Sequence, residues 1–465
     1  MNRTSLALFM ALLLGGCSTL RSDYHTPAAQ LPPQWQQPVT GSSQLQQQKW
    51  WMAFGDPTLD GLIEQALKHN NDLALAGLKL QKARMQADLT GSNRWPTPAA
   101  EVNGSSSKAW NKGSASTRSY NASLSVSYEV DLWGRLAASR DAARWEAEAT
   151  AEDRAATALT LIGTTAGYYW QIAYLNEAIT LGEQSLADTR RAWQLAEVKY
   201  RAGAVGALDV VQAKQDLATQ QASLLDLRNQ REAARNALAL LFDAAPEQHQ
   251  PERAGLQSAT LPDVAPEAPA SLLGRRPDLR ASEWRLRSTL ATADNTRLSL
   301  YPVFSLTGSA GGSSGSLSNV LSNPIATLGA GLTLPFVDWQ RQNIQIDMAS
   351  NDYQQAVVSF RQDLYNALGE VENGLAARHY YLQQGEQLTQ ALDLARQSER
   401  LSEVQYRSGK STLQDWLDAQ QKRRTAELAL SQNRLTLLKN QMSLYQALGG
   451  SDRSWPISLL LTILK

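Results

Sequence analysis

Several features that would point to chemistry are scarce in this sequence of 465 residues. It has one cysteine and four histidines, too few for a convincing cluster of metal ligands. It also lacks a phosphate-binding glycine loop and the strained serine turn of the hydrolases. Lys plus Arg balance Asp plus Glu at 44 each, so no excess of basic charge favours a nucleic acid. We therefore expect no enzyme, no metal, no cofactor and no nucleic-acid partner.

The N-terminus lacks a hydrophobic run long enough to cross a bilayer, because its apolar stretch covers only Leu6–Leu14. Such a short run predicts a removable signal peptide over residues 1–16. The residues Leu14-Gly15-Gly16-Cys17 resemble a bacterial lipobox, whose cysteine carries a covalent lipid such as palmitate. A lone cysteine in an exported protein has no disulfide partner, so a lipid on Cys17 explains it better than a buried thiol. Ser18 follows it instead of Asp, which in lipoproteins indicates the outer membrane.

Proline is absent from two long stretches, residues 135–201 and 341–407. In both, apolar side chains recur at spacings of three and four, which predicts amphipathic helices. About 67 residues at a rise of about 1.5 Å make roughly 100 Å of helix, several times the average length in globular proteins. Helices of this length favour coiled-coil packing against neighbours. The pattern resumes over Ala207–Leu241 and Leu413–Leu448.

The chain contains a tandem duplication with an offset of 206 residues. The offset places Asp72-Leu73 on Asp278-Leu279, Trp95-Pro96 on Tyr301-Pro302, Trp133 on Trp339, Asp209 on Asp415, and Tyr200, Arg201 and Gly203 on Tyr406, Arg407 and Gly409. Each half begins with a helix, Leu59–Arg94 or Pro277–Leu300, which an aromatic-proline pair ends. We therefore divide the chain into a signal peptide (1–16), an anchored linker (17–58), a first repeat (59–241), a proline-rich linker (242–276), a second repeat (277–448) and a C-terminal tail (449–465).

Each half also carries a predicted pair of strands. Side chains alternate over Ser119–Val130 and Ala326–Phe336, with weaker partners at Ala100–Ser106 and Val303–Ala310. One interpretation is an amphipathic sheet over a soluble core. In a membrane, however, strands must close into a barrel, and the smallest barrels need about eight strands. Four strands cannot close one, whereas two chains would supply eight and three would supply twelve, and a wide interior favours the larger number.

Three further motifs carry a family resemblance. Together, Trp50-Trp51-Met52-Ala53-Phe54-Gly55-Asp56-Pro57, Asp131-Leu132-Trp133-Gly134-Arg135 and Tyr406-Arg407-Ser408-Gly409 resemble the lipoprotein branch of the TolC-type outer membrane factors. The resemblance implies a mainly α fold with membrane β, in which a homotrimer forms one 12-stranded β-barrel and a long periplasmic barrel of α-helices. It implies a passive outer-membrane duct that exports small molecules such as drugs. The implied partners are a periplasmic adaptor (membrane fusion) protein and an inner-membrane pump of the resistance-nodulation-division type.

The two Tyr-Arg-x-Gly motifs lie where each long helix is predicted to reverse. Gly203 and Gly409 suit a left-handed helix end. By resemblance, the same turns form the exposed tip that docks the adaptor. The residues of this predicted docking tip are Tyr200, Arg201, Gly203, Ala204, Val205, Arg407, Gly409, Lys410 and Ser411.

Asp415 and Asp418 lie three residues apart and therefore share one helix face. Such a pair is commonly a solvated face or a helix cap. In a symmetric trimer, three copies of each would ring the axis and constrict a pore for cations, and the resemblance implies such an acidic aperture. It also implies that Tyr406 and Asp209 hold the closed state by hydrogen bonding, so that opening is an iris-like movement of the inner helices.

Two other functions compete with the efflux duct. One is an export duct for an ABC-type protein secretion system, which neighbouring genes would distinguish. The other is a non-conducting periplasmic lipoprotein that tethers the envelope, although a tether has no use for alternating strands. The exported substrate stays open, because we expect selection to occur mostly at the pump.

Overall fold

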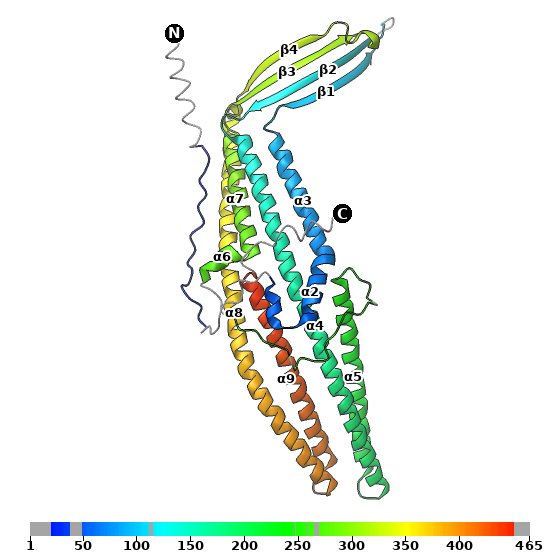
Figure 1. Ribbon diagram of the computed structural model, residues 1–465. Coiled ribbons are helices and arrows are strands. Elements are labelled where there is room, and N and C mark those ends of the chain that lie inside the picture. The colour runs from blue at the N-terminus through cyan, green and yellow to red at the C-terminus, as the bar shows by residue number, and fades with distance from the viewer. Residues whose placement is uncertain are drawn as a thin grey trace. The chain divides into compact units, whose positions relative to one another are not determined.

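The computed structural model describes residues 20–37, 49–110, 115–246, 248–257, 259–264 and 269–450. The predicted signal peptide, Cys17 and the tail beyond Gly450 lie outside these residues. Within them the chain is mostly helical, with one four-stranded sheet (Figure 1). The α-helices are α2 (Pro57–His69), α3 (Asn71–Ser92), α4 (Arg135–Arg201), α5 (Ala207–Leu240), α6 (Leu272–Arg275), α7 (Pro277–Leu298), α8 (Trp339–Arg407) and α9 (Leu413–Ala447). The short 3-10 helices are η1 (Trp50–Phe54), η2 (Pro269–Ser271), η3 (Leu317–Asn319) and η4 (Pro335–Asp338).

The two stretches without proline form single helices, as predicted. Helix α4 has 67 residues and α8 has 69. The return helices α5 and α9 begin at the predicted residues and each end one residue early. Continuous helices of this length need partners along their sides, since propensity alone does not stabilise them.

The chain forms two compact units, and each unit draws on both halves of the duplication. One, which we call the sheet unit, includes Leu78–Glu152 and Arg280–Asp363. The other, the turn unit, includes Gln30–Gly77, Asp153–Leu279 and the residues from Leu364 onward. Helices α4 and α8 therefore contribute to both units. A repeat of the sequence is consequently not a separate folding unit.

The sheet unit contains β1 (Thr97–Ser107), β2 (Thr117–Val130), β3 (Val303–Ser314) and β4 (Ile325–Thr333). The strands pair antiparallel in the order β1-β2-β3-β4, so the β2–β3 pair joins the two halves of the chain. Every residue of the edge strands β1 and β4 is exposed. Each edge strand keeps one unpaired side, which is a template for pairing with another chain.

Strands β1, β2 and β4 begin one to three residues earlier than predicted, and β3 and β4 end several residues away from the predicted residue. Strand β4 stops at Thr333 rather than Phe336, because Pro335 has no N–H for pairing and instead begins η4. Strand β3 runs four residues beyond Ala310. It continues there because Gly311 allows a close approach to β2, where a Cβ would lie 2.4 Å from the Ala122 carbonyl oxygen.

The predicted first helix, Leu59–Arg94, is wrong, because the structure has two helices that meet at Asn70. The backbone of Asn70 is extended, with φ of −67° and ψ of 129°. Its Oδ1 accepts a hydrogen bond of 3.0 Å from the Leu73 N–H, and its Nδ2 donates to the Leu241 carbonyl at 3.1 Å. Asparagine is a preferred helix N-cap, so the signal for this break was present in the sequence.

Part of the predicted N-terminal linker belongs to the core of the turn unit. Trp50 and Trp51 are 2% and 1% exposed. Trp50 stacks on Tyr445 with ring centroids 5.3 Å apart, and Phe54 packs on Trp170 at 5.0 Å. These aromatic contacts explain why the linker motif is rich in large rings, since such pairs add to the burial of apolar area.

The proline-rich linker between the repeats is also bound to helices of the turn unit. Arg235 Nη2 donates to Glu252 Oε2 at 2.8 Å, and the Leu256 N–H donates to Glu177 Oε2 at 3.0 Å. Leu256 itself is 2% exposed. The linker residues around Glu252 and Leu256 are therefore a packed part of this unit.

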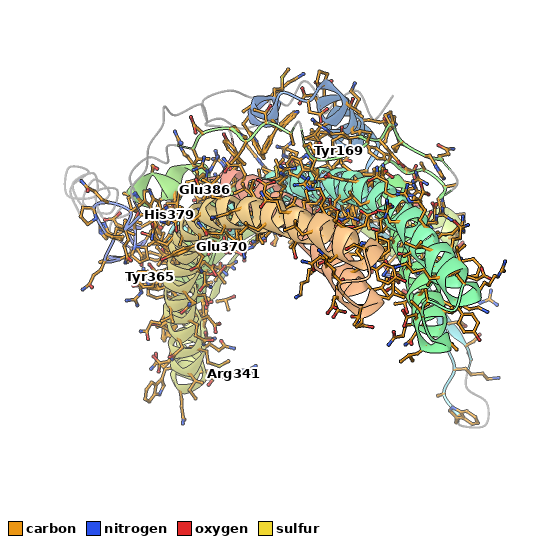
Figure 2. All side chains as sticks on the ribbon, turned by 90° about the horizontal axis from the view of Figure 1, so that it is seen from below. Tyr169, Arg341, Tyr365, Glu370, His379 and Glu386 are labelled. Carbon is orange, nitrogen blue, oxygen red and sulfur yellow. The ribbon has the colours of Figure 1, made fainter. Side chains whose placement is uncertain are left out.

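Helix α8 holds two further segments of the turn unit through side chains labelled in Figure 2. Tyr365 Oη accepts a hydrogen bond of 3.3 Å from the Gln30 N–H. Glu370 Oε2 accepts one of 2.6 Å from Arg276 Nη1. These contacts attach the N-terminal segment and the start of the second repeat to the same helix.

Candidate gate and docking surface

The turns from α4 to α5 and from α8 to α9 have the same backbone geometry. Gly203 and Gly409 both have a φ of 73°, which glycine adopts without steric cost. The Gly203 N–H donates to the Tyr200 carbonyl at 2.9 Å, and the Gly409 N–H donates to the Tyr406 carbonyl at 3.1 Å. Both turns lie at the same end of the turn unit (Figure 1). The predicted role of the two glycines in ending the long helices is confirmed.

Most residues of the predicted docking tip are accessible at these turns. Those exposed are Tyr200, Arg201, Gly203, Ala204, Arg407, Gly409 and Lys410, whereas Val205 and Ser411 are half-buried. Matched ion pairs join Arg201 to Glu197 at 2.6 Å and Arg407 to Glu403 at 2.7 Å. Exposed pairs of this spacing contribute only about 0.2–0.5 kcal/mol, so the turns present a mixed, hydrated surface.

The two equivalent tyrosines have different surroundings. Tyr200 is 48% exposed, whereas Tyr406 is 2% exposed. The duplication superimposes these residues, yet only the second is part of a packed core. Tyr200 is therefore suited to contact a partner and Tyr406 to hold helices together.

Tyr406 lies in a buried cluster, which we call the tip cluster. Its members come from α4, α5, α8 and α9, and they are Ala192, Ala196, Ala213, Tyr406, Leu413, Trp416 and Leu417. The Tyr406 and Trp416 rings stack with centroids 5.5 Å apart and planes at 28°. The small side chains on α4 and α5 leave room for these rings. The tip cluster thereby joins the α4–α5 hairpin to the α8–α9 hairpin.

Lys199 of α4 adds a polar contact to the tip cluster. Its Nζ lies 3.8 Å from the centroid of the Tyr406 ring and donates a hydrogen bond of 2.7 Å to the Tyr406 carbonyl. A cation over an aromatic face is attracted by the ring quadrupole. Neither Lys199 nor Trp416 was predicted from the sequence as a site residue. The available signal was a departure from the duplication, which places Gln405 at the position equivalent to Lys199.

The structure brings Asp209 near Tyr406, but the two side chains do not form a hydrogen bond with each other. Tyr406 Oη is buried and has no hydrogen-bond partner among the residues that the structure describes. Burial raises the pKa of Tyr406, and the nearby Asp209 carboxylate raises it further. Asp209 is half-buried in the first turn of α5, where a negative charge is favourable. Within the described chain, the Asp209 carboxylate therefore helps to keep the Tyr406 hydroxyl protonated.

Asp415 and Asp418 are both exposed on the first turns of α9. The Asp415 N–H donates to Thr412 Oγ1 at 3.2 Å, and the Thr412 N–H donates to Asp415 Oδ2 at 2.9 Å, forming a capping box. The Thr412 hydroxyl and then its backbone N–H lower the pKa of Asp415. Asp418 Oδ1 accepts a hydrogen bond of 2.7 Å from Gln414 Nε2. Asp415 thus caps α9, and both carboxylates remain open to solvent.

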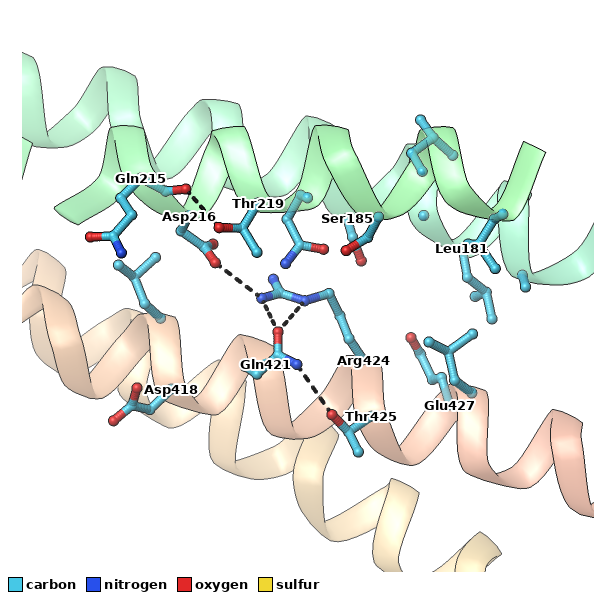
Figure 3. A pocket seen from close by; sticks show the side chains of 18 of the residues that line it. Leu181, Ser185, Gln215, Asp216, Thr219, Asp418, Gln421, Arg424, Thr425 and Glu427 are labelled. Atoms are coloured by element: carbon cyan, nitrogen blue, oxygen red, sulfur yellow. Dashed lines mark hydrogen bonds and ion pairs between the residues drawn. The ribbon is translucent and has the colours of Figure 1, made fainter. Parts of the chain in front are cut away.

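A cavity of about 540 Å³ lies between α4, α5 and α9, and Asp418 is among its lining residues (Figure 3). Amide side chains such as Gln215 and Gln421 and carboxylates such as Asp216 also line it. The one lining arginine is Arg424, which is 6% exposed. The sequence analysis did not single out Arg424, because a charged residue on a long helix is usually solvated.

The fold and the site together define a class of protein. In the described part of the chain, groups of three or more His, Cys, Asp or Glu that could hold a metal ion are absent. None of the helices that the same residues form has the length and the apolar character to cross a membrane. What the chain offers is a four-stranded antiparallel sheet with two open edges and two long helical hairpins. This is the architecture of a subunit of an oligomeric outer-membrane channel.

The chain belongs to the outer membrane efflux protein family. The family model matches residues 62–242 and matches again at residues 268–450. The two matches begin 206 residues apart (268 − 62), which is the offset of the internal duplication. The predicted family is therefore confirmed.

Named relatives and solved structures agree with this membership. The chain is 30% identical over 452 residues to the pyoverdine export outer membrane protein OpmQ of Pseudomonas putida, covering 95% of this chain and 96% of the relative. It is also 30% identical to the cation efflux system protein CusC of Escherichia coli, and the match covers 95% of this chain and 97% of that relative. The outer-membrane channel OprN superimposes with a TM-score of 0.82 at 26% identity, covering 93% and 99%. The open-state channel MtrE of Neisseria gonorrhoeae superimposes with a TM-score of 0.81 at 27% sequence identity, and the match covers 93% of this chain and 99% of MtrE.

Several predictions about function are thereby confirmed. The chain is an outer-membrane component of an efflux system, and it is a channel subunit rather than an enzyme. It lies in the outer membrane with a periplasmic extension. Outer membrane efflux proteins are trimeric and work with an adaptor and an inner-membrane pump. The comparisons do not favour the protein secretion duct or the tethering lipoprotein.

Proposed function

We propose that three copies of this chain form the exit duct of a tripartite pump that exports small molecules, and that the turn unit closes this duct. The observation that carries the gate is the tip cluster, in which Tyr406 and Trp416 of the α8–α9 hairpin share a buried core with the alanines that α4 and α5 contribute. An opening movement has to separate these hairpins. Three copies of Asp415 and Asp418 would then ring the axis beside the cluster and favour cations.

The exposed residues of the two turns form the proposed docking surface for the adaptor. Support comes from their accessibility and from the repeated geometry at Gly203 and Gly409. With both turns at one end of the unit, a trimer would present six similar turns, two from each chain, to a ring of adaptors. The proposed inner-membrane partner is a pump of the resistance-nodulation-division type, which would supply the energy and select the substrate.

The proposed covalent lipid on Cys17 fixes the mature N-terminus to the outer membrane. The supporting observations are the lipobox-like residues that end at the lone cysteine. Such an anchor and the barrel would provide two independent attachments to the membrane. Mass measurement of the mature N-terminal peptide tests this part directly, because an unmodified cysteine would rule it out.

Planar-bilayer conductance of the purified mature protein tests the duct and its gate, with the oligomer mass measured in the same detergent. We expect a trimer whose closed-state current is small and selective for cations. Replacing both Asp415 and Asp418 by Asn should raise the current and weaken the cation preference. Asp393→Asn removes an exposed charge from the body of α8 and should change neither. A monomer without channel activity would refute the proposed duct.

A further inference from the structure

A second cavity of the turn unit, which we call the α4–α9 groove, lies away from the two turns. Its volume is about 500 Å³, and small-molecule sites commonly have about 300–1,000 Å³. Six of its lining residues come from α4 and four from α9. They include the rings of Tyr168 and Trp170, the thioether of Met442 and a single charged residue, Lys439. The groove therefore offers apolar surface beside one positive charge.

Two glycines of α4 shape the α4–α9 groove. A Cβ at Gly163 would clash with the side-chain amide of Gln446, whose Nε2 donates a hydrogen bond of 2.7 Å to the Leu159 carbonyl. The two helices are therefore in close contact at this end. One turn further along α4, a Cβ at Gly167 would have no described atom within 4 Å. The missing side chain of Gly167 thus leaves open space beside a closed end.

Lys439 brings an uncompensated charge into the α4–α9 groove. Its side chain is half-buried, and its Nζ donates a hydrogen bond of 2.8 Å to Gln171 Oε1. Among the described residues that line the groove there is no Asp or Glu. Burial lowers the pKa of Lys439, as it does for an ammonium that lacks an opposing carboxylate. An ammonium has three donors, so Lys439 can also donate to a ligand.

The α4–α9 groove lies on the side of these helices that η1 and α2 leave uncovered. Tyr169 of α4 donates a hydrogen bond of 3.0 Å to the N-cap residue of α2, and Tyr445 of α9 stacks on Trp50 of η1. Gly167, which lines the groove, is two residues from Tyr169. Ser443 has the same relation to Tyr445 on α9. Residues two apart on a helix project about 160° from each other, so the groove and the short helices lie on opposite sides.

We propose that the α4–α9 groove binds small organic anions that combine a carboxylate with an aromatic or apolar body. The Lys439 ammonium pairs with the carboxylate, and the rings of Tyr168 and Trp170 contact the apolar body. This inference rests on the proposed duct, whose lumen has to stay open, so that η1 and α2 lie outside it. The groove then faces the lumen, and its ligands belong to the cargo that passes along the wall.

Equilibrium dialysis of the purified mature trimer against 1-naphthoate tests the site, with the amount held by detergent alone subtracted. We expect saturable binding of one molecule per chain. Lys439→Gln should weaken binding about tenfold or more, because it removes the charged partner, whereas Lys439→Arg should retain most of the affinity. Gly167→Leu fills the open space and should abolish binding. Lys422→Gln removes an exposed charge of the same helix α9 and should bind like the wild type.

Two further probes separate the charge from the apolar surface. The neutral 1-naphthalenemethanol and the small anion acetate should each bind roughly tenfold more weakly than 1-naphthoate, because each lacks one of the two contacts. Equal affinity for 1-naphthoate and 1-naphthalenemethanol would overturn the proposed site. Wild-type affinity in either Lys439→Gln or Gly167→Leu would do the same. The trimer mass and melting temperature of each variant should match the wild type, which excludes a loss of fold.

The binding measurement is independent of channel opening, so it separates this inference from the proposed duct. Saturable binding of 1-naphthoate by a protein that does not conduct would refute the duct and support the groove as a ligand site. A conducting trimer that binds no 1-naphthoate above the detergent background would refute the site at Lys439 alone.

Discussion

Asp294 accepts two hydrogen bonds from Ser22, one from the backbone N–H and one from the hydroxyl, each 2.8 Å long. Asp294 is only 4% exposed on α7, and a buried carboxylate without such donors is costly. Arg21 binds Asp141 of α4 at 2.7 Å in the same region. Residues 20–24, which we call the N-terminal arm, are therefore bound to the sheet unit. The sequence predicted only a linker that trails from the lipid.

Asp294→Ala should release the N-terminal arm. The substitution removes both acceptors of Ser22, and hydrogen bonds to a charged group contribute about 1.5–3 kcal/mol each at most. Trypsin can cut after Arg21 only when the arm leaves its site, so we expect cleavage at Arg21 to be faster in the variant. Mass spectrometry of the N-terminal fragment measures the rate. Asp23→Asn alters an exposed neighbour and serves as the control. Equal cleavage rates in Asp294→Ala and the wild type would show that the arm is not held by this contact.

Tyr406→Phe and Tyr406→Ala should differ in their effect on stability. The Tyr406 hydroxyl is buried and unpartnered in the described chain, so Phe should leave the melting temperature of the detergent-solubilised protein unchanged or slightly higher. Ala removes the ring that stacks on Trp416 and should cost about 3–5 kcal/mol. Circular dichroism at increasing temperature distinguishes them. A clear loss of stability in Tyr406→Phe would mean that the hydroxyl finds a partner in the assembled trimer.

Gly409→Ala should destabilise the α8–α9 turn by about 1–2 kcal/mol, the cost of a left-handed backbone for a residue with a Cβ. Nothing lies within 4 Å of a Cβ at this position, so the cost is purely conformational. Gly409→Asn should lose less, because asparagine tolerates this backbone. Chemical denaturation measures the three proteins side by side. Equal stability of the Ala variant and the wild type would contradict the left-handed turn.

Acid should release the linker between the repeats through Glu252. Burial opposes the charge on Glu252, but hydrogen bonds from Arg235 and then Asn176 prevail and hold its pKa below the ordinary value of 4.5. Because the pKa of Glu252 is lower in the folded protein than in the unfolded chain, its carboxylate adds to the stability of the fold. This stabilisation is complete above pH 4.5 and is lost as the pH falls through the pKa of the folded state. Urea midpoints at neutral and acidic pH should therefore differ less in Glu252→Gln than in the wild type. Glu101→Gln, on an exposed strand, should retain the full difference.

The long elements of the fold were predictable because their signals are repeated many times. An uninterrupted periodic pattern without proline spans residues 135–201 and 341–407, and it is enough to predict both long helices. The four strands followed from alternation, and the duplication allowed each half to support the other. By contrast, the break at Asn70 and the end of β4 depend on single residues. Such local signals compete with a strong periodic pattern and are easily overridden.

The chemistry of the tip was only partly predictable. The roles of Gly203 and Gly409 could be predicted, because a left-handed backbone conformation at the end of a helix favours glycine. The buried state of Tyr406 and the exposed state of Tyr200 could not be inferred, because the duplication makes the two positions look alike. Arg423 and Arg424 also form ion pairs with Asp188 and Asp216, which lie more than two hundred residues away in sequence. Whether a charged side chain is buried depends on how the helices pack, and a local sequence pattern does not encode that packing.

The two open edges of the sheet have a genetic consequence. In a closed ring of three subunits, β4 of each chain must pair with β1 of the next, so the barrel has three identical seams. A proline introduced into β1 removes a backbone N–H and disrupts the pairing with β4 of the neighbouring subunit, even when that neighbour is intact. If half of the chains in a cell carry it, only about one ring in eight contains three intact subunits. An allele of this kind should therefore be dominant over the normal gene, and cells that express both should lose most of their efflux.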